Sequence, residues 1–307
     1  MSPIASVDVP ASTANLGSGF DCFAAALSLK LRAELHVGDE PGIVLNAHGE
    51  GAPAAGDDPE ANLVIRSFRE GMRAAHGSVT GSGAWRIEVS SMIPAARGLG
   101  SSAAAIVAGL LLGASVGRRA PTADELLAIA TQVEGHPDNV AAALYGSFTL
   151  AAGGTLRRFR SPESWMPVVF VASAQSRTAE MRAALPASVP HAEAARQAAR
   201  SALLATAIMT SDAGLLREAM SDGLHQPYRL PLLPGAAALI EAAYEHGAAG
   251  AALSGAGPSV LAICDSPISA HSVEKAWNAS GVPGMATRLR FDVTGARLNT
   301  AEQERDR

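Results

Sequence analysis

The sequence predicts a globular chain of mixed helices and strands that is divided into two parts. Its 307 residues correspond to one large domain or two ordinary ones, at roughly 150 residues per domain. Apolar residues follow the two-residue period of strands in some segments and helical spacing in others. An arginine-rich run at 153–167 interrupts both patterns. We place the boundary there, with parts at 1–160 and 161–300 and a polar tail at 301–307.

Three strands and three helices are expected in the first part. Pro10 breaks the first strand, and a loop rich in Gly, Pro and Asp follows the second at 49–58. Thr122 with Glu125 three residues later is a capping box, which begins the third helix. The strands are assigned to 4–9, 31–37 and 85–90, and the helices to 63–76, 103–116 and 122–133.

In the second part, a continuous apolar run predicts a buried strand, and segments with helical spacing predict helices. A glycine-rich turn precedes the last strand, and the last nine residues are polar, as in a frayed tail. The assignments are a strand at 168–172, helices at 192–211, 213–222 and 236–246, and a turn and strand within 253–264.

The charge balance excludes some functions. With 24 basic and 29 acidic residues the net charge is -5, which argues against a nucleic-acid binder. Only Lys30 and Lys275 are lysines. Neither follows a glycine-rich loop, so the chain has no Walker A motif and is not a P-loop NTPase. Lys30 is expected to be a solvent-exposed charge.

Neither the cysteines nor the hydropathy indicates a secreted or membrane protein. Cys22 and Cys264 are far apart and form no metal-binding or disulfide pattern, and no signal peptide is visible, so we expect a cytoplasmic location. Residues 98–117 are uncharged and numerous enough to span a membrane. Their serines, glycines and alanines favour a buried helix instead.

A first candidate segment, 94–104, leads from a strand into the apolar helix. A helix N-terminus offers unpaired N–H groups and a partial positive charge, which attract phosphate. Gly98 and Gly100 would let the backbone approach a ligand, while Ser101 and Ser102 add hydroxyl groups. Such a loop can hold phosphates without a lysine, although an ordinary glycine turn with a serine N-cap explains the same residues.

Two further segments can also be explained either by a ligand site or by ordinary chain structure. Asn15 and Asp21 flank glycines in an expected loop at 10–21, where they could face a cleft or make an ordinary turn. Gly255 and Gly257 precede a strand and imply close backbone approach, either to a ligand or to another part of the chain.

Taken together and in order, the three segments resemble the signature motifs of the GHMP kinases, which include galactokinase, homoserine kinase, mevalonate kinase and phosphomevalonate kinase. The blocks 15–21, 134–140 (EGHPDNV) and 225–229 (HQPYR) narrow the resemblance to the homoserine kinases. It extends over about residues 7–263, nearly the whole chain.

The resemblance implies a fold and a reaction. The fold would be a two-domain α+β GHMP kinase fold, with an N-terminal half like ribosomal protein S5 domain 2 and a ferredoxin-like C-terminal half. The enzyme would use ATP and Mg²⁺ to phosphorylate the side-chain hydroxyl of L-homoserine, a step toward threonine. Members of this family commonly form homodimers, so the resemblance would also make the protein a homodimer.

It also implies an ATP site. Ser101 or Ser102 would hold Mg²⁺ together with Glu134, since this ion prefers oxygen ligands. The residues around the phosphates would be Pro94, Ala95, Ala96, Arg97, Gly98, Leu99, Gly100, Ser101, Ser102, Ala103 and Ala104, with Gly255 and Gly257.

For the amino-acid substrate, the resemblance implies that Asn15 orients the attacking hydroxyl and that Asp21 pairs with the ammonium. Arg182 and Arg229 would clamp the carboxylate, because the planar arginine fork suits bidentate binding. For Arg229 the alternative is a surface arginine beside a proline-rich turn. His136, Asn139 and Thr178 would complete the pocket.

No lysine lies between residues 9 and 21, where several relatives carry one. We therefore expect in-line transfer without a dedicated lysine base, because phosphoryl transfer depends mainly on positioning and charge stabilisation. Asp21 as general base is the competing mechanism. Ser18, Cys22 and Phe23 depart from the family's usual residues and could alter the shape of the pocket.

Three other functions are alternatives to homoserine phosphorylation. A mevalonate-like or sugar substrate fits less well, because two arginines favour an amino-acid carboxylate. The joint presence of both serines, Glu134 and Asp21 speaks against a ligand sensor without turnover. Net acidity and few aromatic residues disfavour an RNA binder that uses the S5-like half.

Overall fold

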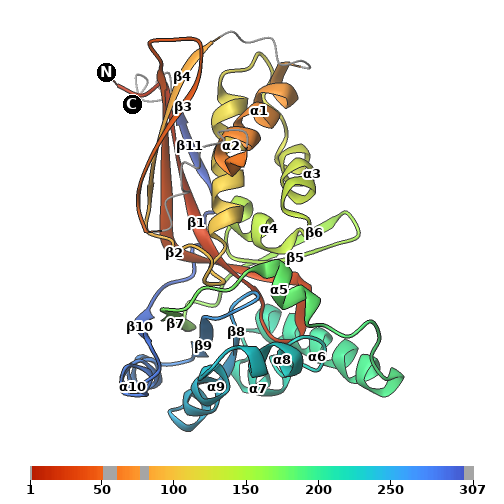
Figure 1. The fold of residues 1–307 in the computed structure, drawn as a ribbon. Helices are drawn as coiled ribbons and strands as arrows, with labels where there is room; N and C mark the ends of the chain where they lie inside the picture. The colour runs from red at the N-terminus through yellow and green to blue at the C-terminus, as the bar shows by residue number, and fades with distance from the viewer. Residues whose placement is uncertain (1, 51–60, 77–82, 301–307) are drawn as a thin grey trace.

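The computed structural model describes residues 2–50, 61–76 and 83–300, which form two sheets with helices packed on them. A larger sheet carries four helices on one face, and a smaller one lies below it with the remaining helices around it (Figure 1). Helices and strands are thus mixed in both halves, as in the predicted α+β fold. In the described part of the chain, no helix is long and apolar enough to cross a membrane.

The larger sheet has seven strands, in the order β11-β1-β2-β4-β3, with β5 paired to β2 and β6 paired to β5. All of its pairs are antiparallel except β3 with β4. The strand β11 comes from the end of the chain and lies against β1. The bounds are β1 Ala5–Asn15, β2 Gly19–Val37, β3 Gly42–Gly49, β4 Ala84–Ser91, β5 Phe148–Ala152, β6 Thr155–Phe159 and β11 Arg297–Thr300.

The helices α1 to α4 cover one face of this sheet (Figure 1). Inward-facing apolar residues of β1 and β2 pack with the alanine-rich α2 in one core. The capping box of Thr122 and Glu125 is present at the start of α3. The bounds are α1 Leu63–His76, α2 Ser101–Ser115, α3 Ala123–Glu134 and α4 Asp138–Tyr145.

The smaller sheet is antiparallel, with the order β10-β7-β9-β8. Numbered from β7, this is strand order 4-1-3-2, the topology of the predicted ferredoxin-like half. Trp277 on α10 packs edge-on against Phe170 of β7 in its core. The strands are β7 Met166–Ala172, β8 Gly250–Leu253, β9 Val260–Cys264 and β10 Gly284–Arg288, and the helices are α5 Thr178–Ala183, α6 His191–Thr210, α7 Leu216–Ala219, α8 Gln226–Arg229, α9 Ala236–Glu245 and α10 Pro267–Asn278.

The structure corrects the first predicted strand and the loop after it. Pro10 does not end β1, which continues to Asn15, because a register shift between Pro10 and Ala11 accommodates the missing donor. Most of the expected loop at 10–21 is therefore the end of β1 and the start of β2, joined by a tight turn at 16–18.

Other predicted segments also differ. Part of the run at 153–167 forms β6, which pairs with β5 across the turn at Gly153 and Gly154. The predicted helix at 213–222 is only a 3-10 turn at Ala213–Leu215 followed by α7. Asn299 and Thr300, assigned to the tail, belong to β11. Most of the 49–58 loop and all of the tail at 301–307 lie outside the described residues.

The contact between α1 and α2 requires glycine. A carbon added at Gly113 of α2 would overlap the carbonyl oxygen of Phe68 on α1, and one added at Gly109 would overlap that of Val64. These helices therefore meet through their backbones, which holds α2 close against α1.

We predict that Gly113→Ala lowers the melting temperature. Alanine would gain about 1 kcal/mol of helix propensity, but overpacking against a backbone atom costs roughly 1–3 kcal/mol. Calorimetry should show the loss. Gly214→Ala is the control, since its added carbon would meet only one Asp212 carboxylate oxygen, at 3.1 Å, and no backbone atom. Equal melting temperatures for both variants and the wild type would contradict a backbone contact.

Candidate active site

A cleft lies where the turn between β1 and β2, the N-terminus of α2, the start of α5 and the loop between β8 and β9 meet. Most of the site residues predicted from the sequence line it, and these are Asn15, Asp21, Ala96, Gly98, Gly100, Ser101, Ser102, Glu134, His136, Asn139, Thr178, Arg182, Arg229, Gly255 and Gly257.

Six residues predicted for the ATP loop do not line the cleft. Leu99, Ala103 and Ala104 are buried in the core of the first half. The Arg97 side chain points to the other half, where its Nε donates to the Ala172 carbonyl at 2.8 Å. Pro94 precedes the turn, and Ala95 begins it. These residues hold the loop in place, and the glycines and serines face the cleft.

Both loop glycines have left-handed backbones, with φ of 74° at Gly98 and 69° at Gly100. A side-chain carbon at Gly98 would overlap the Ser254 carbonyl oxygen, and one at Gly100 would overlap the Ser12 hydroxyl. Close chain approach therefore requires these glycines, independently of any ligand. Gly100 is also the N-cap of α2, so the unpaired N–H groups of this helix begin at the cleft.

Asn15 connects two of the three segments. It is buried, and its Nδ2 donates to the Gly255 carbonyl at 2.7 Å, while its Oδ1 accepts from the backbone N–H of Asp21 at 3.0 Å. The Gly255 N–H in turn donates to the Ala14 carbonyl at 3.0 Å. The Asn15 amide thus holds the backbone of Asp21 and the loop between β8 and β9 in a fixed relation.

The carboxylate of Glu134 lies beside the N-terminus of α2. Ser102 Oγ donates to Glu134 Oε1 at 2.6 Å, and burial raises the pKa of the Glu134 carboxyl above its ordinary value. A hydroxyl and a carboxylate oxygen this close, next to a helix N-terminus that attracts phosphate, form a donor set that suits Mg²⁺. The residues present therefore fit the ion that the resemblance implies.

His136 and Asn139 are both held by hydrogen bonds to the carboxylate of Asp138. His136 Nδ1 lies 2.6 Å from Asp138 Oδ1, and this hydrogen bond raises the pKa of His136. The same carboxylate oxygen accepts from the Asn139 backbone N–H at 2.6 Å. Asp138 is buried and also lines the cleft. Asp138 belongs to the sequence block at 134–140, but the block predicts no separate role for it.

Ser176 and Ala256 are the other cleft residues that were missed. Ser176 Oγ donates to the Gly257 carbonyl at 2.9 Å, and the Ser176 N–H donates to the Ala96 carbonyl at 3.0 Å. Ser176 therefore links the entry of α5 to both glycine-rich loops. No local motif signals such a contact, because its partners are about 80 residues away on either side.

Both predicted arginines lie close to the ring of Phe20. Arg182 on α5 makes two hydrogen bonds to the Asp21 carboxylate, at 2.7 and 2.8 Å. The Arg182 and Arg229 guanidinium carbons lie 5.7 and 5.3 Å from the centre of the Phe20 ring. Arg229 is 1% exposed, so it is no surface arginine.

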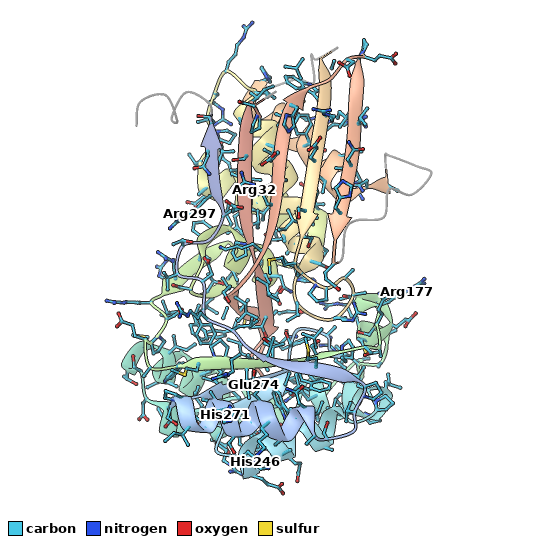
Figure 2. The ribbon with its side chains drawn as sticks, turned by 90° about the vertical axis from the view of Figure 1, so that its left-hand side faces the viewer. Arg32, Arg177, His246, His271, Glu274 and Arg297 are labelled. Atoms are coloured by element: carbon cyan, nitrogen blue, oxygen red, sulfur yellow. The ribbon has the colours of Figure 1, made fainter. Side chains whose placement is uncertain are left out.

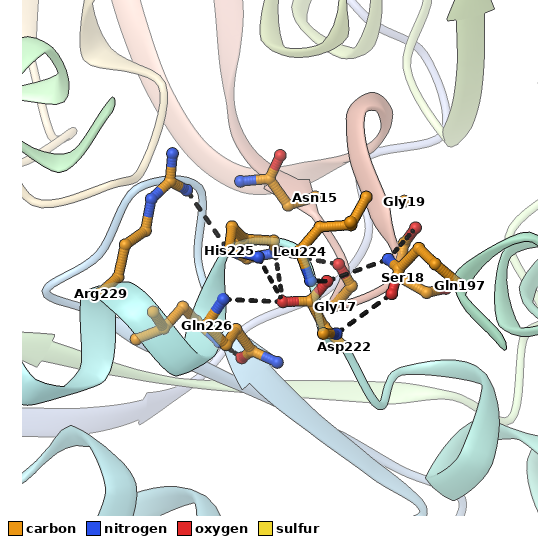
Figure 3. Close-up of polar contacts among 12 residues, drawn as sticks. Asn15, Gly17, Ser18, Gly19, Gln197, Asp222, Leu224, His225, Gln226 and Arg229 are labelled. Carbon is orange, nitrogen blue, oxygen red and sulfur yellow. Dashed lines mark hydrogen bonds and ion pairs between the residues drawn. The ribbon is translucent and has the colours of Figure 1, made fainter. Parts of the chain in front are cut away.

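A buried network holds Arg229 (Figure 3). Its Nη1 lies 3.3 Å from His225 Nδ1, while His225 Nε2 lies 3.0 Å from the Gly17 carbonyl. Burial lowers the pKa of His225, which keeps the ring neutral at neutral pH. Because a carbonyl only accepts, Nε2 carries the proton and Nδ1 accepts from Arg229.

Asp222 anchors this network. Its Oδ2 accepts from the backbone N–H groups of His225 and Gln226 at 2.9 and 2.7 Å, and its Oδ1 accepts from Gln197 Nε2 at 2.9 Å. Gln197 also donates to the Ser18 carbonyl at 2.9 Å. In the sequence, the HQPYR block supports only the resemblance, and Asp222 is predicted to lie at the end of a helix.

The residues that depart from the family pattern lie outside the cleft lining. Ser18 is buried and donates to the Ala219 carbonyl at 2.6 Å. Burial raises the pKa of the Cys22 thiol to about 11, so it stays protonated at neutral pH. Lys30, expected to be a free surface charge, is instead 31% exposed and paired with Asp292 at 2.5 Å.

Family models match both halves of the chain. Residues 62–147 match the GHMP kinases N terminal domain, and residues 199–283 match the GHMP kinases C terminal model. Among solved structures, a homoserine kinase from Cytophaga hutchinsonii superposes with a TM-score of 0.86 at 25% identity, over 96% of this chain and 98% of that one. A mevalonate kinase structure, at 14% identity and a TM-score of 0.70, shares the fold.

Curated relatives match over nearly the full length. A homoserine kinase from Synechococcus sp. is 38% identical over 97% of this chain and 96% of its own. One from Streptomyces avermitilis is 42% identical over 94% of each. Both identities and coverages are high enough to establish descent, and the predicted blocks of the sequence meet in one cleft. The chain therefore belongs to the homoserine kinases of the GHMP kinase family.

Proposed function

We propose that the protein transfers the γ-phosphoryl group of ATP to the side-chain hydroxyl of L-homoserine, which yields O-phospho-L-homoserine for threonine biosynthesis. The observation that carries this proposal is the meeting, in one cleft, of a phosphate-attracting helix N-terminus and two arginines beside an aspartate. One side of the cleft suits a nucleotide, and the other suits an amino acid.

The nucleotide phosphates would lie against the backbone between Gly98 and Ser102, where the N–H groups at the start of α2 stabilise negative charge. Ser102 and Glu134, with Ser101 beside them, would hold Mg²⁺. The ion neutralises charge on the phosphates when it is bound. The cleft thereby handles phosphate without a lysine.

The substrate side favours a zwitterion. In the structure Arg182 and Asp21 neutralise each other. An amino acid can enter between them, because its carboxylate can take over the arginine and its ammonium can take over the aspartate. The buried Arg229 supplies a second positive group for the carboxylate. A neutral sugar offers neither charge, so it would leave both groups less well paired.

In the chemical step the hydroxyl oxygen attacks the γ-phosphorus in line, and the bond to the ADP oxygen breaks. Asn15 would align the hydroxyl through its hold on the turn, and the proton would leave to solvent or phosphate without a dedicated lysine base. In the competing version the Asp21 carboxylate accepts this proton, so it would have to contact the hydroxyl as well as the ammonium once the substrate has displaced Arg182.

ADP release with Mg-ATP and a panel of homoserine, serine, mevalonate and galactose tests the function directly. We expect turnover with homoserine far above the background ATPase rate. Absence of turnover with homoserine, together with activity on mevalonate or galactose, would reassign the substrate within the family. Inactivity with all four compounds would point to a sensor.

We predict that Asp21→Asn raises the homoserine KM with little change in kcat. Loss of a charge-assisted contact costs about 1.5–3 kcal/mol, which corresponds to roughly a 10- to 100-fold higher KM. Steady-state kinetics measure the split. Asp8→Asn, in the surface pair with Arg32, is the matched control and should change neither constant. A fall in kcat at unchanged KM would identify Asp21 as the base.

We predict that Glu134→Gln raises the Mg²⁺ concentration needed for half-maximal rate by at least about tenfold, since disturbing a metal site typically weakens binding 10- to 100-fold. A magnesium titration at saturating ATP and homoserine measures it. Glu125→Gln on the same helix is the control, because that side chain serves the N-cap. Identical titration curves for the two variants would rule out Glu134 as a ligand.

We predict that His225→Leu raises the homoserine KM while the ATP KM and kcat change little. Leucine leaves the Arg229 guanidinium without the ring nitrogen that accepts from it, and one such loss amounts to roughly tenfold. His225→Gln, whose amide can both accept and donate, should recover part of the affinity. Parallel increases in both KM values would indicate general damage to the fold.

A further inference from the structure

The open face of the larger sheet carries a second group of titratable side chains. Figure 2 looks onto this face, with the helices behind the strands and Arg32 labelled upon it. Glu34 and His36 are two residues apart on β2 and therefore point to the same side. Glu88 on β4 is the direct cross-strand partner of Glu34. One ligand atom from each of the three lies within 4.8 Å of the others.

The two ring nitrogens of His36 are buried without hydrogen-bond partners in the described part of the chain. The residue is 6% exposed, and within the described chain neither ring nitrogen has a hydrogen-bond partner. Its Nε2 points toward Glu34 Oε2 but lies 3.6 Å away, beyond hydrogen-bond distance. A buried polar group left in this way costs about 1–3 kcal/mol, so the geometry calls for a group between the ring and the carboxylate.

The charges around His36 point to a cation. Glu34 and Glu88 are like charges in directly opposed positions, an arrangement that destabilises a sheet. Arg32 Nε binds Glu34 Oε1 at 2.9 Å and also lies near Asp8, so its charge is shared. Arg86 Nε is 3.5 Å from Glu88 Oε1 and makes no hydrogen bond. The arginines therefore leave Glu34 Oε2, on the His36 side, open to a ligand.

We propose that Glu34, His36 and Glu88 bind a divalent transition-metal ion of the Zn²⁺ type. An imidazole nitrogen with carboxylate oxygens suits Zn²⁺, whereas Mg²⁺ and Ca²⁺ prefer oxygen ligands alone. Three protein ligands leave a fourth position for water. None of the three residues lines the active-site cleft, and the ion would join β2 to β4 across their ladder.

Zn²⁺ titration of the purified full chain in competition with a chromophoric chelator tests this site. To remove any Zn²⁺ bound beside Ser102, the titration is done in the Glu134→Gln background as well. We expect one equivalent to bind in the Glu134→Gln background, and His36→Gln or Glu88→Gln to weaken it at least about tenfold. Zn²⁺ should also raise the melting temperature of the parent but not of these variants.

His271→Gln is the matched control. His271 on α10 forms a similar pair with Glu274, at 3.9 Å, but its side chain is 65% exposed and far from Arg32 in Figure 2. It should leave Zn²⁺ binding unchanged. Because Glu88 is half exposed, its variant should fold even if a change at buried His36 does not. No stoichiometric Zn²⁺ binding, or binding that Glu88→Gln leaves unchanged, would overturn the proposal.

Discussion

The active-site cleft depends on one set of hydrogen bonds between loops that lie far apart in the chain. Asn15 binds the Gly255 carbonyl at 2.7 Å, and Ser254 Oγ donates to the Gly98 carbonyl at 2.6 Å. The first bond joins the tip of β1 to the loop after β8, and the second joins the loop before α2 to it. The N-terminus of α2, where we propose that phosphate binds, belongs to one half of the chain and Arg229 to the other. Their distance is therefore set by these backbone carbonyls, which explains why glycine and small polar residues occupy all three segments.

The scarcity of lysine agrees with how charge is arranged in the cleft. The cleft contains no lysine among its lining residues, which offer backbone N–H groups where we propose that the nucleotide binds and two planar guanidinium groups where we propose that the amino acid binds. Burying Arg229 requires compensation, and it has contacts from the Phe20 ring, the Met181 carbonyl and the neutral His225. A neutral acceptor at His225 orients the guanidinium without cancelling its charge, which leaves the charge available for a carboxylate.

Local signals in the sequence predicted local structure well. The Thr122 capping box, the apolar helix after Ser102 and the strand at Val168 all depend on residues near one another in the chain. Pairings between distant segments could not be predicted in this way. Neither β11 nor β6 has a strong apolar period of its own, because both strands are short and none of their residues is fully buried.

In the cleft, too, the sequence indicated which residues matter but not which distant parts of the chain they contact. A glycine pattern indicates that another group approaches the backbone closely. It does not tell whether that group is a ligand phosphate or part of the chain, such as Ser254 or Ser12. At Gly98 and Gly100 the structure supplies the chain partner, and that contact in turn presents the helix N-terminus to the cleft. The same glycines therefore serve chain packing and place this helix N-terminus where we propose that phosphate binds. The same holds for Asn15, because its amide holds Asp21 and Gly255 together, and the role that we propose for it at a substrate hydroxyl depends on the position of these two groups.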